Sequence, residues 1–555
     1  MKRITKYFSI CLAAGLLTSC DSFLDCSEND FYTLEEIKIN PGRVQNFVNN
    51  VYSYLPSDFC GLEGGMQDAA TDDAVHVYKG SKLQRYVNGT WSANATIDDK
   101  IGSYYKAIHD ANYYMDNMLG LKFESWENHD DYESWMQDYV NSEYEIRFLR
   151  AFYYFELVKR YNQVPLILHA LTQEEANAEK PVPAQQIFDF VKKELTDAAD
   201  NLPINYDNFK SKQYGRITKG MALALKARVL LYEASPLFNT SNSKSKWVEA
   251  AEAAYEVIGQ ASTLGYALDG KFQNLFGDKN HNSKEVIWYR PTGENNDFEK
   301  KNYPMGVTGG QTSTCPTENL ASAFEMANGD PFDWNNPEMK KNPYSGRDPR
   351  FYETIVHNGM SWPNKEVEIF EGGANGLPLL NATTTGYYLR KYVNKSVSFE
   401  PGAPSSKPKH NWILIRYADV LLGYAEAMIN AYGDCNTTTA TCGMSAIDAL
   451  NKVRTRVHMP AISNALSASE FLEKVKHERR VELAFEGHRF WDLRRWKELD
   501  KVSQVYSVRI VKSAAGVEYT KTLLETREIN DKMYFYPIPN SEIFKNKNWI
   551  QNPGW

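Results

Sequence analysis

The sequence predicts an all-α protein in which tetratricopeptide-like helix pairs support a large loop-rich region with minor β pieces. Apolar residues recur at spacings of three and four over segments mostly 12 to 20 residues long, as in amphipathic helices. Short connections between these segments favour antiparallel pairs. No strict repeat period is present, so any repeats are degenerate. Alanines recur where paired helices would approach closely, at Ala222, Ala224, Ala227, Ala250, Ala251 and Ala254.

Each predicted helix is supported by its spacing, its composition or its ends. In the first, Tyr104, Ile108 and Ala111 lie on one side. The third lies between Pro183 and Pro203, in keeping with the punctuation of helix ends. The fourth is rich in Ala and Leu, which have high helix propensity. The predicted helices cover residues 101–118, 143–161, 185–202, 218–235, 247–258, 417–432, 445–457 and 469–499.

Residues 262–410 differ from these helical segments. Gly, Pro, Asn, Ser and Thr cluster there, and short β-like pieces occur at residues 286–289 and 387–389. Residues 60–100 form a second region of this kind. Long loops carried by a rigid scaffold are where binding residues concentrate. Both regions are therefore expected to contribute to a binding surface.

The composition is that of a soluble globular protein, and it argues against nucleic-acid binding and against a membrane-spanning helix. The 555 residues carry a formal net charge of −8, so no excess of basic charge is available for nucleic acid. Mean hydropathy is −0.53, and no run of 18 apolar residues would span a membrane. Aromatic residues are abundant, with 35 Tyr, 26 Phe and 12 Trp. Tyr and Trp suit both cores and partly exposed binding surfaces.

The N-terminus predicts a lipid anchor. Lys2, Arg3 and Lys6 precede the apolar stretch 7–17, and the sequence then runs Leu-Thr-Ser to Cys20. This resembles a bacterial lipoprotein signal, in which cleavage precedes the cysteine and the thiol receives lipid. An acidic tether follows, and it resembles the surface-export signal of lipoproteins in the Bacteroidetes. Its acidic residues are Asp21, Asp25, Glu28 and Asp30. A lipidated Cys20 would anchor the chain to a membrane without spanning it.

No motif predicts a metal, a cofactor or catalysis. Of seven cysteines, Cys11 leaves with the signal and no C-x-x-C occurs, so zinc ribbons are not indicated. Cys435 and Cys442 could pair across a short loop, and this possibility stays open. No metalloprotease, serine hydrolase, P-loop or dinucleotide-binding motif occurs. Adjacent acidic pairs do not establish the carboxylate separation that a glycosidase requires. The sequence therefore predicts no catalytic residues.

Several motifs, in order along the chain, resemble the SusD/RagB family. The segment 479–496, which reads RRVELAFEGHRFWDLRRW, looks like the family hallmark. Its charges could pair at helical spacing, and the resemblance implies that it braces the core without binding ligand. The chain end at 551–555, QNPGW, carries Trp555 where the family more usually has Tyr. Further matching segments are 149–155, 164–166, 226–232, 347–350, 416–422, 425–427 and 536–539.

The resemblance implies a non-catalytic glycan-binding lipoprotein on the cell surface, anchored in the outer membrane. It would capture oligosaccharide or polysaccharide and pass it to a SusC-like, TonB-dependent transporter, which it covers as a lid. Two alternatives remain: a helical-repeat scaffold that binds protein or peptide at the outer membrane, and a surface glycosidase. The expected divisions are a signal peptide (1–19), a lipidated tether (20–40), a helical scaffold with early ligand loops (41–261), a loop-rich ligand-binding region (262–410) and a C-terminal helical scaffold (411–555).

Candidate glycan contacts are chosen by chemistry and by position in loops. Aromatic faces cover the apolar faces of sugar rings, whereas Asp, Asn and Arg bind the hydroxyl edges. In the early loops Trp91 leads because its turn-rich surroundings would display the ring. The candidates there are Asp72, Asp73, Arg85, Tyr86, Trp91 and Asn94. Those in the middle loops are Tyr289, Tyr303, Cys315, Trp334, Trp362 and Arg390.

Overall fold

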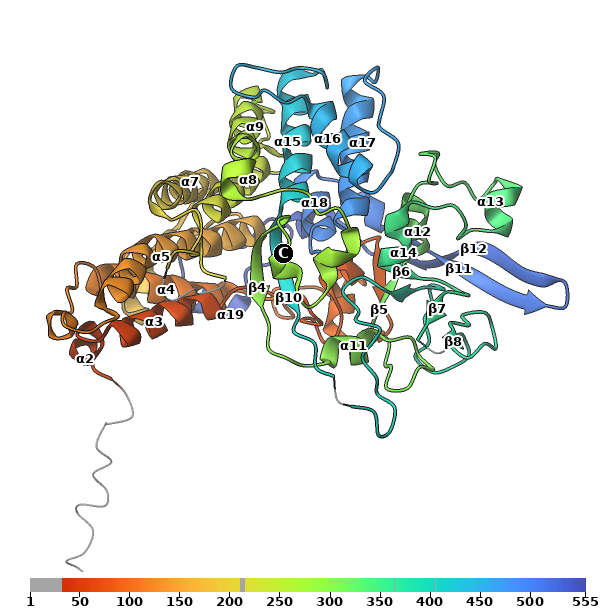
Figure 1. The fold of residues 1–555 in the computed structure, drawn as a ribbon, viewed down its shortest axis with the longest axis horizontal. Coiled ribbons are helices and arrows are strands. Elements are labelled where there is room, and N and C mark those ends of the chain that lie inside the picture. The colour runs from red at the N-terminus through yellow and green to blue at the C-terminus, as the bar shows by residue number, and fades with distance from the viewer. Residues whose placement is uncertain (1–31, 210–214, 364, 405) are drawn as a thin grey trace, which may run out of the picture.

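The computed structural model describes residues 32–209, 215–363, 365–404 and 406–555. Cys20 and the signal peptide lie outside the described residues. Figure 1 shows an array of helices on one side and a loop-rich part on the other, with a long hairpin projecting from its edge. One hydrophobic core cluster contains residues of both parts. The predicted all-α architecture with minor β pieces is confirmed.

The helical array is built by stacking each helix on its predecessor. The helix α5 packs on α7, α7 on α8, α8 on α9, and α9 on α15 from the C-terminal region. Each helix buries an apolar face against the next, which is how repeat helices build a continuous core. The N-terminal helices are α2 (Leu34–Lys38), α3 (Pro41–Ser53), α4 (Ile101–Asn117), α5 (Tyr132–Tyr161), α6 (Gln173–Ala178), α7 (Ala184–Asn201), α8 (Lys219–Ala234), α9 (Lys244–Gly259) and α10 (Ala261–Leu264).

The C-terminal helices pack around α15, which contacts α16 and α17 as well as α9. Short helices interrupt the loop-rich middle. The remaining helices are α11 (Asp297–Asn302), α12 (Glu318–Ala323), α13 (Pro337–Lys341), α14 (Pro349–Thr354), α15 (Tyr417–Tyr432), α16 (Ala446–Arg456), α17 (Ala468–Glu482), α18 (Arg489–Arg495) and α19 (Asn540–Lys545). Single 3-10 turns are η1 (Gln67–Ala70), η2 (Lys82–Tyr86), η3 (Glu124–Trp126), η4 (Phe272–Phe276), η5 (Asn280–Asn282), η6 (Leu499–Val502) and η7 (Asp531–Tyr534).

The described strands form antiparallel pairs that join distant parts of the chain. The pair β4–β10 links both edges of the loop-rich region and confirms the β-like piece at 286–289. The pairs are β1 (Ala74–His76) with β5 (Thr314–Pro316), β2 (Val164–Pro165) with β3 (Pro181–Val182), β4 (Val286–Pro291) with β10 (Asn411–Arg416), β6 (Ile355–Val356) with β9 (Tyr388–Leu389), β7 (Ser361–Trp362) with β8 (Lys365–Glu366), and β11 (Gln504–Ser513) with β12 (Gly516–Thr526).

Two features differ from the sequence expectation. The helix predicted over residues 469–499 is broken between α17 and α18, because Phe485 and Gly487 adopt positive φ values of 60° and 75°. The long hairpin β11–β12 was not expected. Its alternation of β-branched or aromatic residues with polar ones, closed by a turn before Gly516, is the signal that predicts such a hairpin.

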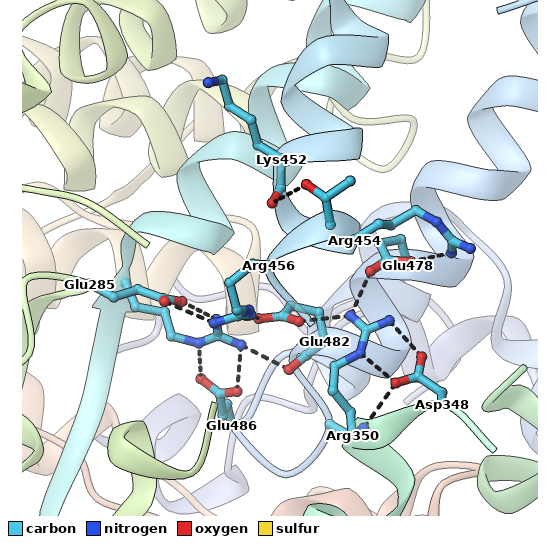
Figure 2. Close-up of polar contacts among 12 residues, drawn as sticks. Glu285, Asp348, Arg350, Lys452, Arg454, Arg456, Glu478, Glu482 and Glu486 are labelled. Atoms are coloured by element: carbon cyan, nitrogen blue, oxygen red, sulfur yellow. Dashed lines mark hydrogen bonds and ion pairs between the residues drawn. The ribbon is translucent and has the colours of Figure 1, made fainter. Parts of the chain in front are cut away.

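The break places the hallmark segment 479–496 in a buried ion network. Glu482 binds Arg416 at 2.6 Å and Arg350 at 2.8 Å. Beyond the break, Glu486 binds Arg416 at 2.7 Å. Figure 2 shows Glu285, Arg350 and Arg456 converging on Glu482 and Glu486. Burial alone would raise the pKa of Glu482, but the guanidinium groups of Arg456, Arg416 and Arg350 hold it well below its ordinary value.

Two further findings concern membrane-spanning helices and the cysteines. Within the described residues no helix is both long and apolar enough to cross a membrane. Cys435 and Cys442, whose pairing the sequence left open, are buried free thiols.

Candidate functional site

An open polar groove of about 610 Å³ lies between η4, η5 and the turn that follows β9. Its size is within the range of ligand-binding pockets. We call it the Arg390 groove. It is lined by Asp269, Gln273, Asn274, Phe276, Gly277, Asp278, Lys279, Asn282, Ser283, Glu353, Arg390, Tyr392, Val393, Asn394 and Lys395.

Hydrogen bonds among the lining residues hold one wall of the groove in place. The carboxylate of Asp269 accepts hydrogen bonds from Ser283 at 2.7 Å and from Asn274 at 3.1 Å. The amide of Gln273 donates to Glu353, on α14, at 3.0 Å. Each bond leaves further acceptor or donor positions on the same group. The wall therefore presents fixed carboxylates and amides with unused hydrogen-bonding capacity.

Arg390 lines another part of the groove, at the turn after β9. Its guanidinium donates to the carbonyl oxygen of Val393 at 2.9 Å and lies 3.9 Å from the Glu353 carboxylate. The exposed side chains of Asn282, Lys279 and Lys395 make no hydrogen bond or ion pair with any residue that the structure describes. These groups are available to hydroxyl-rich ligands, which offer both donors and acceptors.

Lys391 fastens this wall to the hallmark segment. Its ammonium donates to Glu486 at 2.7 Å and to the carbonyl oxygen of Ala484 at 2.7 Å. The ammonium also lies 4.3 Å from the centre of the Phe276 ring, and Phe276 lines the groove. Burial lowers the pKa of Lys391 to about 8. The groove wall is thus held by the same ion network that the hallmark segment builds.

The aromatic rings of the groove contribute little free surface. Phe276 is 7% exposed and Tyr392 is 2% exposed. Tyr392 packs against Trp412 with ring centroids 5.6 Å apart. A ligand in the groove would therefore be held mainly through hydroxyl hydrogen bonds, with stacking as a minor contribution.

The early carboxylates lie in the interior. Asp72 and Asp73 are 3% and 0% exposed. Asp72 binds Arg489 through two hydrogen bonds of 2.9 Å, and Asp73 accepts a hydrogen bond of 2.7 Å from Arg480. Both carboxylates form ion pairs with arginines of the hallmark segment, and their burial leaves almost none of their surface exposed to a sugar. The expectation that they face a ligand is corrected, because tertiary ion pairing removes them from the surface.

Trp91 is 2% exposed, so the expectation of a displayed ring is wrong. Its ring centroid lies 4.8 Å from those of Tyr86, Tyr536 and Trp555. The hydroxyl groups of Tyr86 and Tyr536 are 2.9 Å apart. The C-terminal residues fold back over the early loop and cover the indole. The turn-rich sequence around Trp91 gives no sign of these contacts with the C-terminal residues.

Arg85 and Asn94 remain near the surface. Arg85 is half-buried on η2. The pKa of Glu63 is lowered chiefly by the hydrogen bonds and charge of Lys82, and the charge of Arg85 adds a smaller contribution. Asn94 is exposed and accepts a hydrogen bond of 2.7 Å from Asn540. Neither residue lines the Arg390 groove.

Three candidates from the middle loops are buried. Tyr303 and Trp362 pack edge to face at 5.2 Å, and the Tyr303 hydroxyl donates to the carbonyl oxygen of Val397 at 2.7 Å. Cys315 lies on β5 opposite Val75, and burial raises the pKa of its thiol to about 12. The structure therefore brings Tyr303 and Trp362 together as core residues. The expectation that these three side chains face a ligand is corrected.

The last two candidates are half-buried and lie outside the groove. Trp334 donates its indole N–H to Glu318 at 2.7 Å. Tyr289 lies on β4 with its ring 5.9 Å from that of His281. Arg390 is thus the candidate that lines the groove. Sequence reasoning missed the amides and carboxylates around it, although the stretch 274–283 is rich in Asn and turn-forming residues.

Comparison with known proteins identifies the family. A sequence model described as the SusD family matches residues 274–555, a little over half of the chain. The chain belongs to the SusD family. A second model, described as "Starch-binding associating with outer membrane", matches residues 22–231. The resemblance read from the hallmark segment is confirmed.

Relatives of this SusD-family chain match it over most of its length. SusD-like protein P25 of Formosa agariphila is 23% identical over 522 residues, covering 88% of each chain. A crystal structure of a SusD-like protein from Bacteroides fragilis is 27% identical, with a TM-score of 0.75, and covers 94% of this chain and 98% of its own. A laminarin-binding SusD-like protein shares the fold with a TM-score of 0.64 at 22% identity, covering 93% of this chain and 99% of its own.

Proposed function

We propose that this SusD-family chain is a cell-surface glycan-binding lipoprotein that takes up oligosaccharide in the Arg390 groove. Membership of the family supports a carbohydrate ligand. The observation that carries the proposal is the groove itself, in which carboxylates, amides and a guanidinium from three parts of the chain converge on one open space. Forked groups of this kind match the paired hydroxyls of sugar rings.

In this proposal the chain binds the glycan but does not catalyse a reaction on it. Asp72 and Asp73 are ion-paired with arginines and unavailable as a general acid or nucleophile. In the groove, the carboxylates of Asp269 and Glu353 accept hydrogen bonds from neighbouring side chains and are proposed to bind sugar hydroxyls. Glycoside hydrolysis needs two carboxyl groups facing one cleft at about 5 to 10 Å. The groove is proposed to hold the glycan and release it unchanged.

Delivery to a transporter completes the proposal. The lipid on Cys20 holds the chain at the outer membrane, and the chain covers a SusC-like, TonB-dependent transporter as a lid. The family description of association with the outer membrane supports this location. Detergent extraction and pull-down of the tagged full chain is expected to recover a TonB-dependent transporter. Cys20→Ala is expected to release the chain from the membrane fraction.

Affinity electrophoresis tests the binding site. Polysaccharides including starch and laminarin are cast into native gels, and retardation of the parent chain identifies a ligand. Arg390→Ala is expected to lower the apparent affinity at least about tenfold, since hydrogen bonds involving a charged group contribute about 1.5 to 3 kcal/mol. Asn282→Ala is expected to lower it several-fold, since a neutral hydrogen bond contributes about 0.5 to 1.5 kcal/mol. The matched control is Arg509→Ala, an exposed arginine on β11.

Two results would contradict this proposal. Undiminished retardation of both groove variants would move the glycan to another surface. A chain that recovers the transporter but is retarded by no glycan would favour the scaffold that binds protein or peptide. Release of shorter sugars from a bound glycan would instead indicate a glycosidase.

A further inference from the structure

A second cavity, of about 340 Å³, lies where the N-terminal helices meet β4, β10 and the hallmark segment. We call it the central cavity. It shares no lining residue with the Arg390 groove. Its rim includes the exposed residues Ser53, Gly61 and Ser103, so solutes can reach it from solvent. Its volume lies at the lower end of the range for ligand sites, which suits a single sugar unit.

Most charges of the central cavity neutralise one another. Glu156 binds Lys159 at 2.5 Å and Arg160 at 2.5 Å. Asp98 binds Lys100 at 2.8 Å and Arg160 at 3.1 Å. These contacts hold the wall of the cavity and leave no charge of these groups uncompensated.

Arg290 is different. It lies on β4, is half-buried, and makes no side-chain hydrogen bond or ion pair with any residue that the structure describes. Burial lowers the pKa of its guanidinium, whereas the hydroxyl groups of Tyr153 and Tyr104 raise it. Arg290 therefore brings a partly desolvated positive charge to the cavity, and such a charge is costly unless a ligand or a side chain pairs with it.

Other donors around the same cavity also lack partners. The hydroxyl of Tyr104, which is 1% exposed, has no hydrogen-bond partner among the described residues. The Nε atoms of Arg160 and Arg228 are likewise buried and unbonded. Native structures leave few buried polar groups unsatisfied, so these three buried donors, together with the guanidinium of Arg290, call for a ligand that supplies acceptors.

No ion pair among the described residues joins Arg290 to Asp58, an acid of the same cavity. Asp58 lines the cavity and accepts a hydrogen bond from the backbone N–H of Gln67 at 2.7 Å. Burial, with a smaller contribution from Asp68, raises the pKa of Asp58 well above its ordinary value. The neutral acid is therefore favoured, and the positive charge of Arg290 is left without a counter-ion.

We infer that the central cavity binds the acidic group, a carboxylate or a sulfate ester, of a small saccharide, with Arg290 as its charged partner and Tyr104 as a second donor. An oxyanion supplies several acceptor atoms at one point, which is what the unsatisfied donors lack. The Ser53, Ser57 and Ser103 hydroxyls at the rim are placed for the remaining sugar hydroxyls. The choice of a saccharide as carrier rests on the proposed function.

Isothermal titration calorimetry on the mature chain tests this inference. The probes are sodium glucuronate, glucose 6-sulfate and neutral glucose. Binding of either acidic probe, with no measurable heat from glucose, is expected. Glucuronate alone would assign a carboxylate, and glucose 6-sulfate alone a sulfate ester. Arg290→Gln is expected to weaken the bound probe at least about tenfold, and Arg290→Lys less, since lysine keeps the charge but loses the fork.

A second variant guards against a failure to fold. Tyr104→Phe removes a hydroxyl that has no partner in the part of the chain that the structure describes, so the melting temperature of the variant is expected to stay at or above that of the parent. Its affinity for the acidic probe is expected to fall several-fold. The control for Arg290→Gln is Arg509→Ala, which removes the same charge on the exposed hairpin.

The inference is overturned if neither acidic probe binds the parent, or if Arg290→Gln and Tyr104→Phe bind as the parent does. Retardation by neutral glycans reports on the Arg390 groove, whereas calorimetry with monosaccharide acids reports on the central cavity. Each proposal can therefore fail without the other.

Discussion

The guanidinium of Arg489 donates two parallel hydrogen bonds, each 2.9 Å long, to the carboxylate of Asp72. Both side chains are buried, and they come from opposite ends of the chain. Burial would raise the pKa of Asp72, but Arg480 and Arg489 lower it to about 2. The hallmark segment thus fastens the early loop to the C-terminal helices, and Asp72 acts in the fold and not at a ligand.

Replacing Asp72 with alanine is expected to destabilise the protein strongly. The variant leaves Arg489 buried without its partner, which costs about 3 to 5 kcal/mol for ion pairs of this kind. Urea unfolding followed by circular dichroism measures the loss. The matched control is Glu371→Ala, which removes an equally forked pair with Arg509 on the exposed hairpin. That midpoint is expected to shift little. Equal losses in both variants would contradict a special role for burial.

Trp91→Ala is expected to damage the fold and not glycan recognition. Removing a fully buried tryptophan costs about 3 to 5 kcal/mol, because a cavity opens between Tyr86, Tyr536 and Trp555. Chemical denaturation measures this cost, and affinity electrophoresis measures binding by the protein that remains folded. Trp135→Ala, at a half-buried site on α5, is the reference and should cost less. A stable variant that no longer binds glycan would show that Trp91 contributes to glycan binding.

Asp68 predicts a distinct pH dependence. Burial, then the neighbouring Asp73, raises the pKa of this carboxyl to about 7 in the folded protein. Between about pH 4 and pH 7 the unfolded chain has released this proton while the folded chain retains it. This group therefore lowers the free energy of unfolding by about 1.4 kcal/mol for each pH unit in that window.

Asp68→Asn removes that slope because asparagine does not titrate. Relative to the parent, the variant is expected to gain stability as pH rises to about 7, with no further gain above it. Urea unfolding at pH 5, 6, 7 and 8 measures the difference. Asp531→Asn, at an exposed carboxylate on η7, is the reference. A constant difference between Asp68→Asn and the parent at all four pH values would show that Asp68 is ionised throughout.

Two glycine substitutions are expected to have opposite effects on stability. Gly487 has a φ of 75°, and a Cβ atom added to it would meet only the ring of Trp412, at 3.6 Å. Gly487→Ala is therefore expected to cost about 1 to 2 kcal/mol through backbone strain alone. Gly102 is exposed in the first turn of α4, where an added Cβ atom would have no neighbour within 4 Å. Gly102→Ala is expected to stabilise by about 0.5 to 1 kcal/mol. Thermal unfolding measures both variants, and a Gly487→Ala variant as stable as the parent or more stable would exclude strain at Gly487.

The helices were predictable because their signal is local. The apolar spacing at 417–432 gives α15 with the same bounds, and that at 101–118 gives α4 to within one residue. Pro183 and Pro203 flank α7 closely as well. The family hallmark is also a local string of residues. Fold class and family could therefore be determined from the sequence alone.

The candidate site could not be determined in this way, because burial depends on partners distant in sequence. Trp91 lies in a turn-rich loop, yet Trp555 covers it, and Asp72 lies in a Gly-rich loop, yet Arg489 removes it from solvent. Arg390 lines a groove, but that groove is assembled by η4, η5 and α14, whose approach the local sequence does not show. Sequence determined which side chains can bind sugar hydroxyls. Tertiary packing alone decided which of them keep contact with water, since an ion pair or aromatic stack formed across the chain uses the same groups a ligand would need.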